Sequence, residues 1–569
     1  MAPVSSGLPA MLALLAFLGL PLVEAAKFSA SSFAGATTAA VWPPPNATHD
    51  ASLFPPSVGF PGPTPTGAEP EAIATAPAAA QVSAYFPLLN PGTKDSKTFN
   101  TPRLWGNLAP WFSVASQGLP QASPQIPKGC ELNQVHLLHR HGARYPTTGS
   151  SPSVLATALH NATVAGTGFT ATGELAFLND WSFKLGAELL TPFGREQLFD
   201  LGVGFRVKYG DLLNNFTTLP VFRTTSEQRM LDSALNFAAG FFGVPNFLTD
   251  YNQEIIIEAD GFNNTLAPYE TCQNSNLPVG NFGNVQIAKW QNIYLAAAQK
   301  RLQKEIKGIN LTIPLVFAMQ QTCAYETVAL GFSSFCDLFT EEEWKGYEYS
   351  NDITFWYSNS FGNPTSAAMG IGWVSELVSR LTKTPISVHN TTTNGTLDNS
   401  LTTFPLNQTI YVDASHDTII SAIIVALNFT TLAKAGPLPT NEIQKNQACL
   451  YRSFIVSEIS PFASNLVGQV LSCPASSEPT HIRWILNDAV VPLTGVKGCT
   501  ADKNGLCKLS TFISAMKERV DEIDWAFDCL ANYTVADPAS IVDGRPPVGV
   551  RPKDEFPTRK RKLRRTRLG

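Results

Sequence analysis

Short apolar runs that resemble strands alternate with longer helical patterns through this chain, and this alternation constrains its fold more than any other feature. The strand-like runs are 134–139, 313–319, 409–413 and 482–491. Helical patterns lie at 191–209, 226–242, 285–307 and 365–382, and the apolar stretch 419–427 has the composition of a buried helix. Strands that alternate with helices predict an α/β domain with a mostly parallel sheet flanked by helices.

Segments of different composition follow one another along the 569 residues. Segment 1–26 has a short apolar run followed by small residues, which is typical of a signal peptide, with an uncleaved anchor helix as the alternative. Segment 27–95 is rich in Pro, Ala, Ser and Thr, so we expect a disordered linker. Segment 96–535 is the expected folded domain, and its helix-dense stretch at approximately 204–308 predicts a smaller all-α cap. The basic tail, 536–569, is expected to be disordered.

The charge of the chain is unevenly distributed. Ten basic and two acidic residues between 545 and 569 give that segment +8, so the other residues carry −13 of the formal net charge of −5. An acidic body argues against nucleic acid as a partner. The basic tail could contact an anionic cell wall or membrane surface, or it could simply be solvated.

Sequons and cysteines both indicate export, and hence a secreted protein in the extracellular space or the cell wall. The N-glycosylation sequons are at Asn46, Asn161, Asn215, Asn263, Asn310, Asn390, Asn394, Asn407, Asn428 and Asn532. The nine cysteines include no CxxC pair, which favours disulfides over zinc or thiol redox chemistry. Because the number is odd, at least one thiol is left over.

The segment 140–146, which reads Arg-His-Gly-Ala-Arg-Tyr-Pro, directly follows the first strand-like run. Cleavage of a phosphate ester needs a nucleophile, positive charge around the phosphate and an acid for the leaving alkoxide. Neutral His141 can attack phosphorus and form a phosphohistidine. Arg140 and Arg144 can grip phosphate oxygens in a forked geometry, and Gly142 permits a tight turn against the ligand.

A metal site is the competing interpretation of this region, because His136, His139 and His141 are spaced like metal ligands. Two guanidinium groups beside His141 would repel a dication, and alternate strand residues often only pack. We therefore expect neither a metal nor another cofactor, and we expect structural roles for His136 and His139.

A second polar segment, 413–417, follows another strand-like run and should reach the same edge of the sheet. There His416 can hold the phosphate opposite His141. Asp417 can donate a proton to the leaving group and then activate water. The alternative is that Asp413 or Asp417 only caps the following helix.

Beyond the heptad 140–146, further segments follow the pattern of one known family, namely 222–229, 323–327, 335–340, 461–464 and 486–493. Through them the chain resembles the histidine acid phosphatases, and among these the fungal phytase (3-phytase) branch. The resemblance extends from Cys130 to Cys529. It implies a phosphoglycerate-mutase-like α/β domain beside a smaller α-domain, with the active site in the cleft between them. It also implies that Arg223 is a third phosphate-binding arginine.

The resemblance further implies the disulfide pairing, which the sequence alone could not supply. The pairs would be Cys130–Cys473, Cys272–Cys529, Cys323–Cys336 and Cys499–Cys507, with Cys449 unpaired.

The expected function is therefore that of a secreted acid phosphatase that hydrolyses phosphomonoesters, with phytate (inositol hexakisphosphate) as the favoured substrate. Fungal phytases often have lysines shortly after the heptad, whereas 147–152 has none, and Thr418 replaces a common Asn. These departures leave open a broad-specificity acid phosphatase. A catalytically inactive cell-wall binding protein of the same fold is a more distant alternative. The need for a protonated Asp417 predicts an acidic pH optimum, unless burial raises its pKa.

Overall fold

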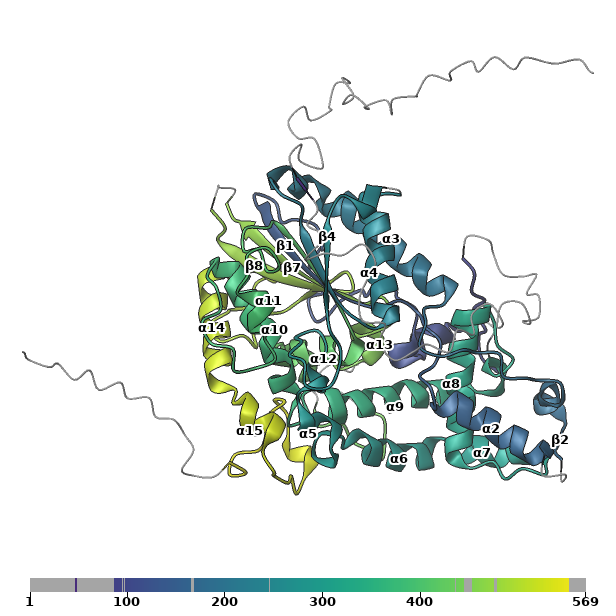
Figure 1. Ribbon diagram of the computed structural model, residues 1–569. Coiled ribbons are helices and arrows are strands. Elements are labelled where there is room, and N and C mark those ends of the chain that lie inside the picture. The colour runs from purple at the N-terminus through teal and green to yellow at the C-terminus, as the bar shows by residue number, and fades with distance from the viewer. Residues whose placement is uncertain are drawn as a thin grey trace, which may run out of the picture.

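A mixed sheet of eight strands forms the centre of the computed structural model (Figure 1). The strand order is β10-β8-β7-β1-β6-β3-β4, and β9 pairs with β8. The mutually parallel strands are β1 (Glu131–Arg140), β6 (Ile410–Ser415), β3 (Val221–Thr225) and β4 (Asn252–Ile256). The strands in antiparallel pairs are β7 (Asn465–Ser472), β8 (His481–Leu486), β9 (Ala489–Val491) and β10 (Cys507–Lys508). The predicted α/β fold is confirmed, although only half of the sheet is parallel.

The structure describes residues 47–48, 86–94, 96, 98–164, 168–244, 246–434, 436–444, 453–474 and 478–551. The predicted signal peptide, most of the predicted linker, Cys449 and the basic segment 552–569 lie outside the described residues. Shorter described elements are β2 (Thr170–Ala171), β5 (Ile306–Lys307), α5 (Gln273–Asn276), α11 (Gly395–Asp398), α13 (Val456–Ile459) and α15 (Trp525–Leu530).

Helices cover both faces of the central sheet (Figure 1). α3 (Pro192–Tyr209) and α4 (Gln228–Phe242) pack on one face, where Phe237 and Leu137 of β1 belong to one buried cluster. α10 (Ser366–Thr382), α12 (Asp417–Ala426) and α14 (Leu509–Glu522) pack on the other face, where Leu138 and Trp484 belong to a second cluster. Neighbouring residues of β1 join different clusters because successive side chains of a strand point to opposite faces.

A smaller group of helices lies beside the sheet, at the lower right of Figure 1. Its members are α2 (Ser151–Val164), α6 (Gly283–Tyr294), α7 (Ala296–Gln303), α8 (Ile313–Leu330) and α9 (Glu341–Asn359). This group differs from the predicted cap at 204–308, because the first half of that stretch supplies β3, α4 and β4 to the α/β part. The two strands have only five residues each, so the helical pattern around them dominated the prediction.

Two predicted strands have other structures. The run 313–319 is the start of α8, whose side chains from 316 to 320 are all buried. Periodicity alone does not separate such a helix from a buried strand, and Pro314 lies in the first turn, where its missing N–H interrupts no hydrogen bond. The run 482–491 is the hairpin β8–β9, which turns at Asn487 and Asp488 with φ of 48° and 70°.

The folded part extends beyond the predicted boundaries at both ends. The backbone N–H of Leu89 donates to the carbonyl of Gly331 at 2.8 Å. Near the other end, the backbone N–H of Ala367 donates to the carbonyl of Gly544 at 3.0 Å. Segments 86–94 and 536–551 therefore pack on the domain.

Four disulfides cross-link the domain, and they are the pairs that the resemblance implies: Cys130–Cys473, Cys272–Cys529, Cys323–Cys336 and Cys499–Cys507. Among the described residues, no helix has both the length and the apolar character that crossing a membrane requires.

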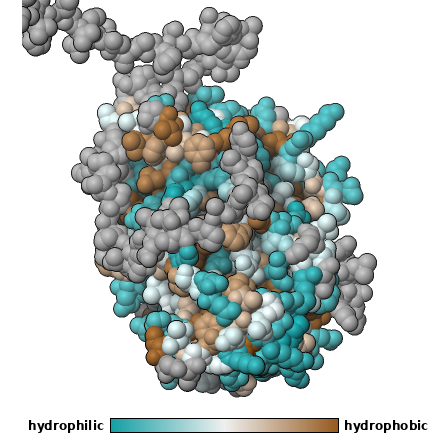
Figure 2. Space-filling view, turned by 90° about the vertical axis from the view of Figure 1, so that its right-hand side faces the viewer, coloured by the Kyte–Doolittle hydropathy of each residue, from teal (hydrophilic) through white to brown (hydrophobic). Residues whose placement is uncertain are grey.

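The outer side of α3 carries apolar side chains. Phe199, Val203 and Val207 follow one another at four-residue spacing and are 38%, 40% and 82% exposed. On the side of the molecule that Figure 2 shows, apolar patches lie among polar residues, several of them in the upper part.

Candidate active site

The register between β1 and β6 brings the two polar segments together. The strands are parallel neighbours in which Arg140 is the partner of Ser415, so the next residues, His141 and His416, leave the sheet side by side. The backbone N–H of His141 donates to the carbonyl of Ser415 at 3.2 Å. The centroids of the two imidazole rings are 5.9 Å apart. This is the carboxyl edge of the parallel strands, where α/β proteins bind ligands.

His141 has the protonation state that a nucleophile needs. Its Nδ1 lies 2.8 Å from the carbonyl oxygen of Gly142, which can only accept, so Nδ1 carries the hydrogen and the lone pair is on Nε2. Burial lowers the pKa of His141 well below its ordinary value, and the charges of Arg140, Arg229 and Arg144 lower it further. Both effects favour the neutral imidazole, which is the form that can act as a nucleophile.

Arg140 and Asp417 form a buried pair beside this histidine. Nη2 of Arg140 lies 2.7 Å from Oδ2 of Asp417, and Nη1 donates to the carbonyl of Ser460 at 2.9 Å. Asp417 also accepts hydrogen bonds from Nδ2 of Asn107 and from the backbone N–H of Thr418, both at 2.8 Å. Burial favours a raised pKa for Asp417, but the charge of Arg140 and these hydrogen bonds outweigh it, so the pKa lies below its ordinary value.

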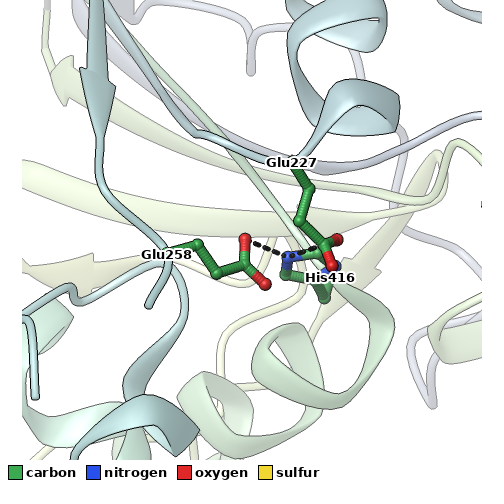
Figure 3. Close-up of side chains that lie close together, drawn as sticks. All are labelled: Glu227, Glu258 and His416. Carbon is green, nitrogen blue, oxygen red and sulfur yellow. Dashed lines mark hydrogen bonds and ion pairs between the residues drawn. The ribbon is translucent and has the colours of Figure 1, made fainter. Parts of the chain in front are cut away.

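His416 lies at the N-cap of α12, between two carboxylates (Figure 3). Its Nε2 is 3.2 Å from Oε2 of Glu258 and 4.0 Å from Oε2 of Glu227. Glu258 also accepts hydrogen bonds from the hydroxyls of Thr225 and Tyr269. Burial tends to raise the pKa of Glu258, but His416 and these hydrogen bonds lower it to about 2. The carboxylate of Glu258 is thus ionised and can only accept a hydrogen bond. Nε2 of His416 is therefore the donor in the contact between these two groups.

Residues 131–487 match the model of the histidine phosphatase superfamily (branch 2). The chain belongs to this family. It is 33% identical to Phytase A of Aspergillus oryzae, and the match covers 75% of this chain and 90% of that relative. It is 34% identical to Phytase A of Aspergillus fumigatus, and that match covers 73% of this chain and 88% of the relative. Its fold is similar to the crystal structure of the phytase from D. castellii, with a TM-score of 0.61 and 28% identity over 77% of this chain and 89% of that chain.

The sheet edge of this histidine phosphatase gathers five of the six predicted site residues, namely Arg140, His141, Arg144, His416 and Asp417. Arg144 is partly buried and donates from Nη1 to the carbonyl of Tyr145 at 2.9 Å, and its charge acts on His141 and Asp417.

Arg223, the sixth predicted residue, lies elsewhere. It is inside β3, where its register partner is Asp413 on β6, below the edge at which the strands end. Its Nε is 2.7 Å from Oδ1 of Asp413, and its Nη2 is 2.6 Å from Oε2 of Glu376. With these donors paired and the side chain 2% exposed, Arg223 holds the sheet together and does not face His141.

Arg229, which the sequence analysis did not select, lies near the histidines instead. It is in the first turn of α4, and its charge lowers the pKa of His141. Nη1 lies 2.9 Å from Oε2 of Glu188, and Nη2 is paired with Glu227. The signal that could have found it was its place at the start of the helix after β3, because residues that follow parallel strands reach the ligand edge.

The two remaining histidines of the first strand are structural. Burial lowers the pKa of His136 to about 3 and that of His139 to about 4. His136 stacks on Tyr411 with ring centroids 4.9 Å apart, and His139 stacks on Phe237 at 5.2 Å. Because they lie against different elements, they do not form a metal site together.

One cluster among the described residues has metal-ligand character, since single donor atoms of Glu227, Glu258 and His416 lie within 4.8 Å of one another. A cation there would face the guanidinium of Arg229, which is already paired with Glu227, and would have to displace the hydrogen on Nε2 of His416. The ion pair with Arg229 and the hydrogen on His416 therefore argue against a metal at this cluster.

Proposed function

We propose that this protein hydrolyses phosphate monoesters through a covalent phosphohistidine at His141. The observation that carries the proposal is the neutral, buried imidazole of His141, with its free Nε2 surrounded by the charges of Arg140, Arg144 and Arg229. Such a group is both a nucleophile and part of an anion site. His416, at the start of α12, adds a donor and the positive end of a helix dipole.

The proposed reaction has two steps. In the first, Nε2 of His141 attacks phosphorus, the bond from phosphorus to the ester oxygen breaks, and protonated Asp417 gives its proton to the leaving oxygen. In the second, Asp417 takes a proton from water, the hydroxide oxygen bonds to phosphorus, and the bond from phosphorus to His141 breaks. Protonation of Asp417 also weakens its pair with Arg140, which leaves Nη2 of Arg140 available to a phosphate oxygen.

Inositol phosphates, and phytate in particular, are the proposed substrates. The support is that two relatives, 33% and 34% identical to this chain, and a solved structure 28% identical to it are all named as phytases. The absence of lysine from 147–152 weakens the case for phytate and keeps open the alternative, a broad-specificity acid phosphatase. Initial rates on phytate and on an aryl phosphate, measured side by side, separate the two, and much slower turnover of phytate would exclude the phytase function.

The variant His141→Ala tests the covalent mechanism. We expect near-complete loss of turnover and no trapped phosphohistidine when the reaction is quenched without acid. The matched control is His160→Ala, because His160 is exposed on α2 and should keep the wild-type rate. A surviving rate in His141→Ala would refute the covalent mechanism. Only a wild-type protein that turns over no phosphate ester would reopen the inactive cell-wall binding protein as an alternative.

Secretion is also part of the proposal, supported by the four disulfides and by exposed sequon asparagines such as Asn215 and Asn407. The test is to look for the protein in culture medium and to treat it with a glycosidase. Truncation after residue 551 tests whether the basic segment holds the protein on an anionic cell wall: retention should fall if it does.

A further inference from the structure

Glu227 occupies the space between two groups that the proposed function assigns to the phosphate. It directly precedes α4, and its side chain is 15% exposed. Its Oε2 is paired with Nη2 of Arg229 and lies 4.0 Å from Nε2 of His416 (Figure 3). A phosphate oxygen held by Arg229 and His416 together would need this position, because carboxylate and phosphate oxygens accept hydrogen bonds from the same donors.

We propose that Glu227 competes with the substrate phosphate and must take up a proton before an anion can bind between Arg229 and His416. This inference rests on the proposed function and names a residue that determines affinity, and its dependence on pH, at the same site. Once protonated, Glu227 no longer forms an ion pair with Arg229 and no longer repels the incoming anion.

The charged groups around Glu227 come from several elements. Burial raises the pKa of Glu227, and the charges of Glu258 after β4 and Glu188 before α3 raise it further. The charges of His416 and Arg229 act in the opposite direction, and the net result is a pKa above the ordinary value. The other titratable groups that interact with Glu227 are Tyr269 and Glu270.

The consequence for binding has a definite sign. Below the pKa of Glu227 the side chain is neutral and the site is open to anions. Above that pKa, Glu227 must take up one proton from solution for each anion that binds. The affinity for anions therefore falls by about tenfold for each further pH unit.

Calorimetric binding of sulfate to the full-length protein tests the proposal. Sulfate is the probe because its own charge stays constant through the acidic range, so proton uptake reports only on the protein. Titrations at a pH where Glu227 is ionised, in buffers with different ionisation enthalpies, give the number of protons taken up. We expect Glu227→Gln to take up about one proton fewer than the wild type and to bind sulfate on the order of tenfold more tightly.

Glu188→Gln is the matched control. Glu188 also pairs with Arg229, at 2.9 Å, but its backbone N–H and its Oε1 bind the segment 146–148. Removing its charge should therefore tighten sulfate binding while the wild-type proton uptake remains. Glu227→Ser, which shortens the side chain, should behave like Glu227→Gln and guards against an effect of one particular substitution.

Proton uptake by Glu227→Gln equal to that of the wild type would overturn the proposal, as would sulfate binding no tighter than in the wild type. His141→Ala separates this result from the proposed function. That variant should still bind sulfate with wild-type proton uptake, so continued turnover in His141→Ala would refute the phosphohistidine and leave the assignment of Glu227 standing.

Discussion

At the scale of single residues, Asp417 should determine how the reaction responds to pH. Burial favours a raised pKa, but Arg140 and Asn107 hold the pKa of Asp417 below its ordinary value. Because the first step needs the protonated form, kcat/KM should rise as the pH falls toward that pKa and decrease by about tenfold per unit above it. A pH–rate profile on an alkyl phosphate measures this, and a maximum near neutral pH would contradict the assignment.

The role of Asp417 as an acid also predicts a dependence on the leaving group. Asp417→Asn keeps the size of the side chain but removes the proton that the departing oxygen needs. We expect turnover of an inositol phosphate to fall by about 10²–10⁴, and turnover of an activated aryl phosphate to fall much less, since an aryl oxide leaves without a proton. Equal losses on both substrates would mean that Asp417 acts on phosphate binding or on the fold.

Arg229 is predicted to bind phosphate, in place of Arg223. Arg229→Ala removes one charge-assisted contact of about 1.5–3 kcal/mol, so KM or the inhibition constant of inorganic phosphate should rise about 10- to 100-fold. Arg229→Lys keeps the charge and should recover part of the loss. Arg229→Lys should keep most of the melting temperature, whereas Arg229→Ala removes the partner of Glu188 and Glu227 and should lower it, so KM is measured on the folded protein. An unchanged KM in Arg229→Ala would exclude Arg229 from the site.

At the scale of elements, Arg223 links β3 to its neighbours β6 and α10 in the α/β domain through buried ion pairs. It pairs with Asp413 on β6 and Glu376 on α10, and Arg380 on α10 also lies 2.7 Å from Asp413. Arg223→Met would leave buried carboxylates short of a partner, so we expect a loss of about 3–5 kcal/mol in the free energy of unfolding. Denaturant titration measures it, and the folded fraction should keep the wild-type KM. A raised KM without a loss of stability would return Arg223 to the active site.

The sequence predicted the elements that carry the chemistry better than those around them. β1 and β6 were found because each is an apolar run followed by polar residues, and their parallel pairing then places His141 beside His416. β3 and β4 were missed because each is only five residues long. The contact between Glu227, Glu258 and His416 depends on loops after three different strands, so no local pattern could reveal it.

At the scale of the whole molecule, the sequence predicted two parts but divided them at the wrong residues. The helical part draws on 151–164 and on 283–359, so the chain leaves it and returns to it. The amino-acid composition changes little where the chain passes from one part to the other, because apolar side chains form the cores of both parts. Boundaries set by tertiary contacts, such as those that include 536–551, are not encoded in local composition.

The disulfides should stabilise the molecule to different degrees, because they close loops of different length in the unfolded chain. Cys272–Cys529 joins positions 257 residues apart, whereas Cys323–Cys336 joins positions 13 residues apart. In the chain-entropy model the longer loop restricts the unfolded chain more, by about 2.5 kcal/mol for these two separations. Replacing both cysteines of the long-range pair with serine should therefore lower the free energy of unfolding more than the same change in the short-range pair. Denaturant titration of the two double variants measures the difference. A larger loss from the short-range pair would show that local packing in the helical part, and not the entropy of the unfolded chain, determines what each disulfide contributes.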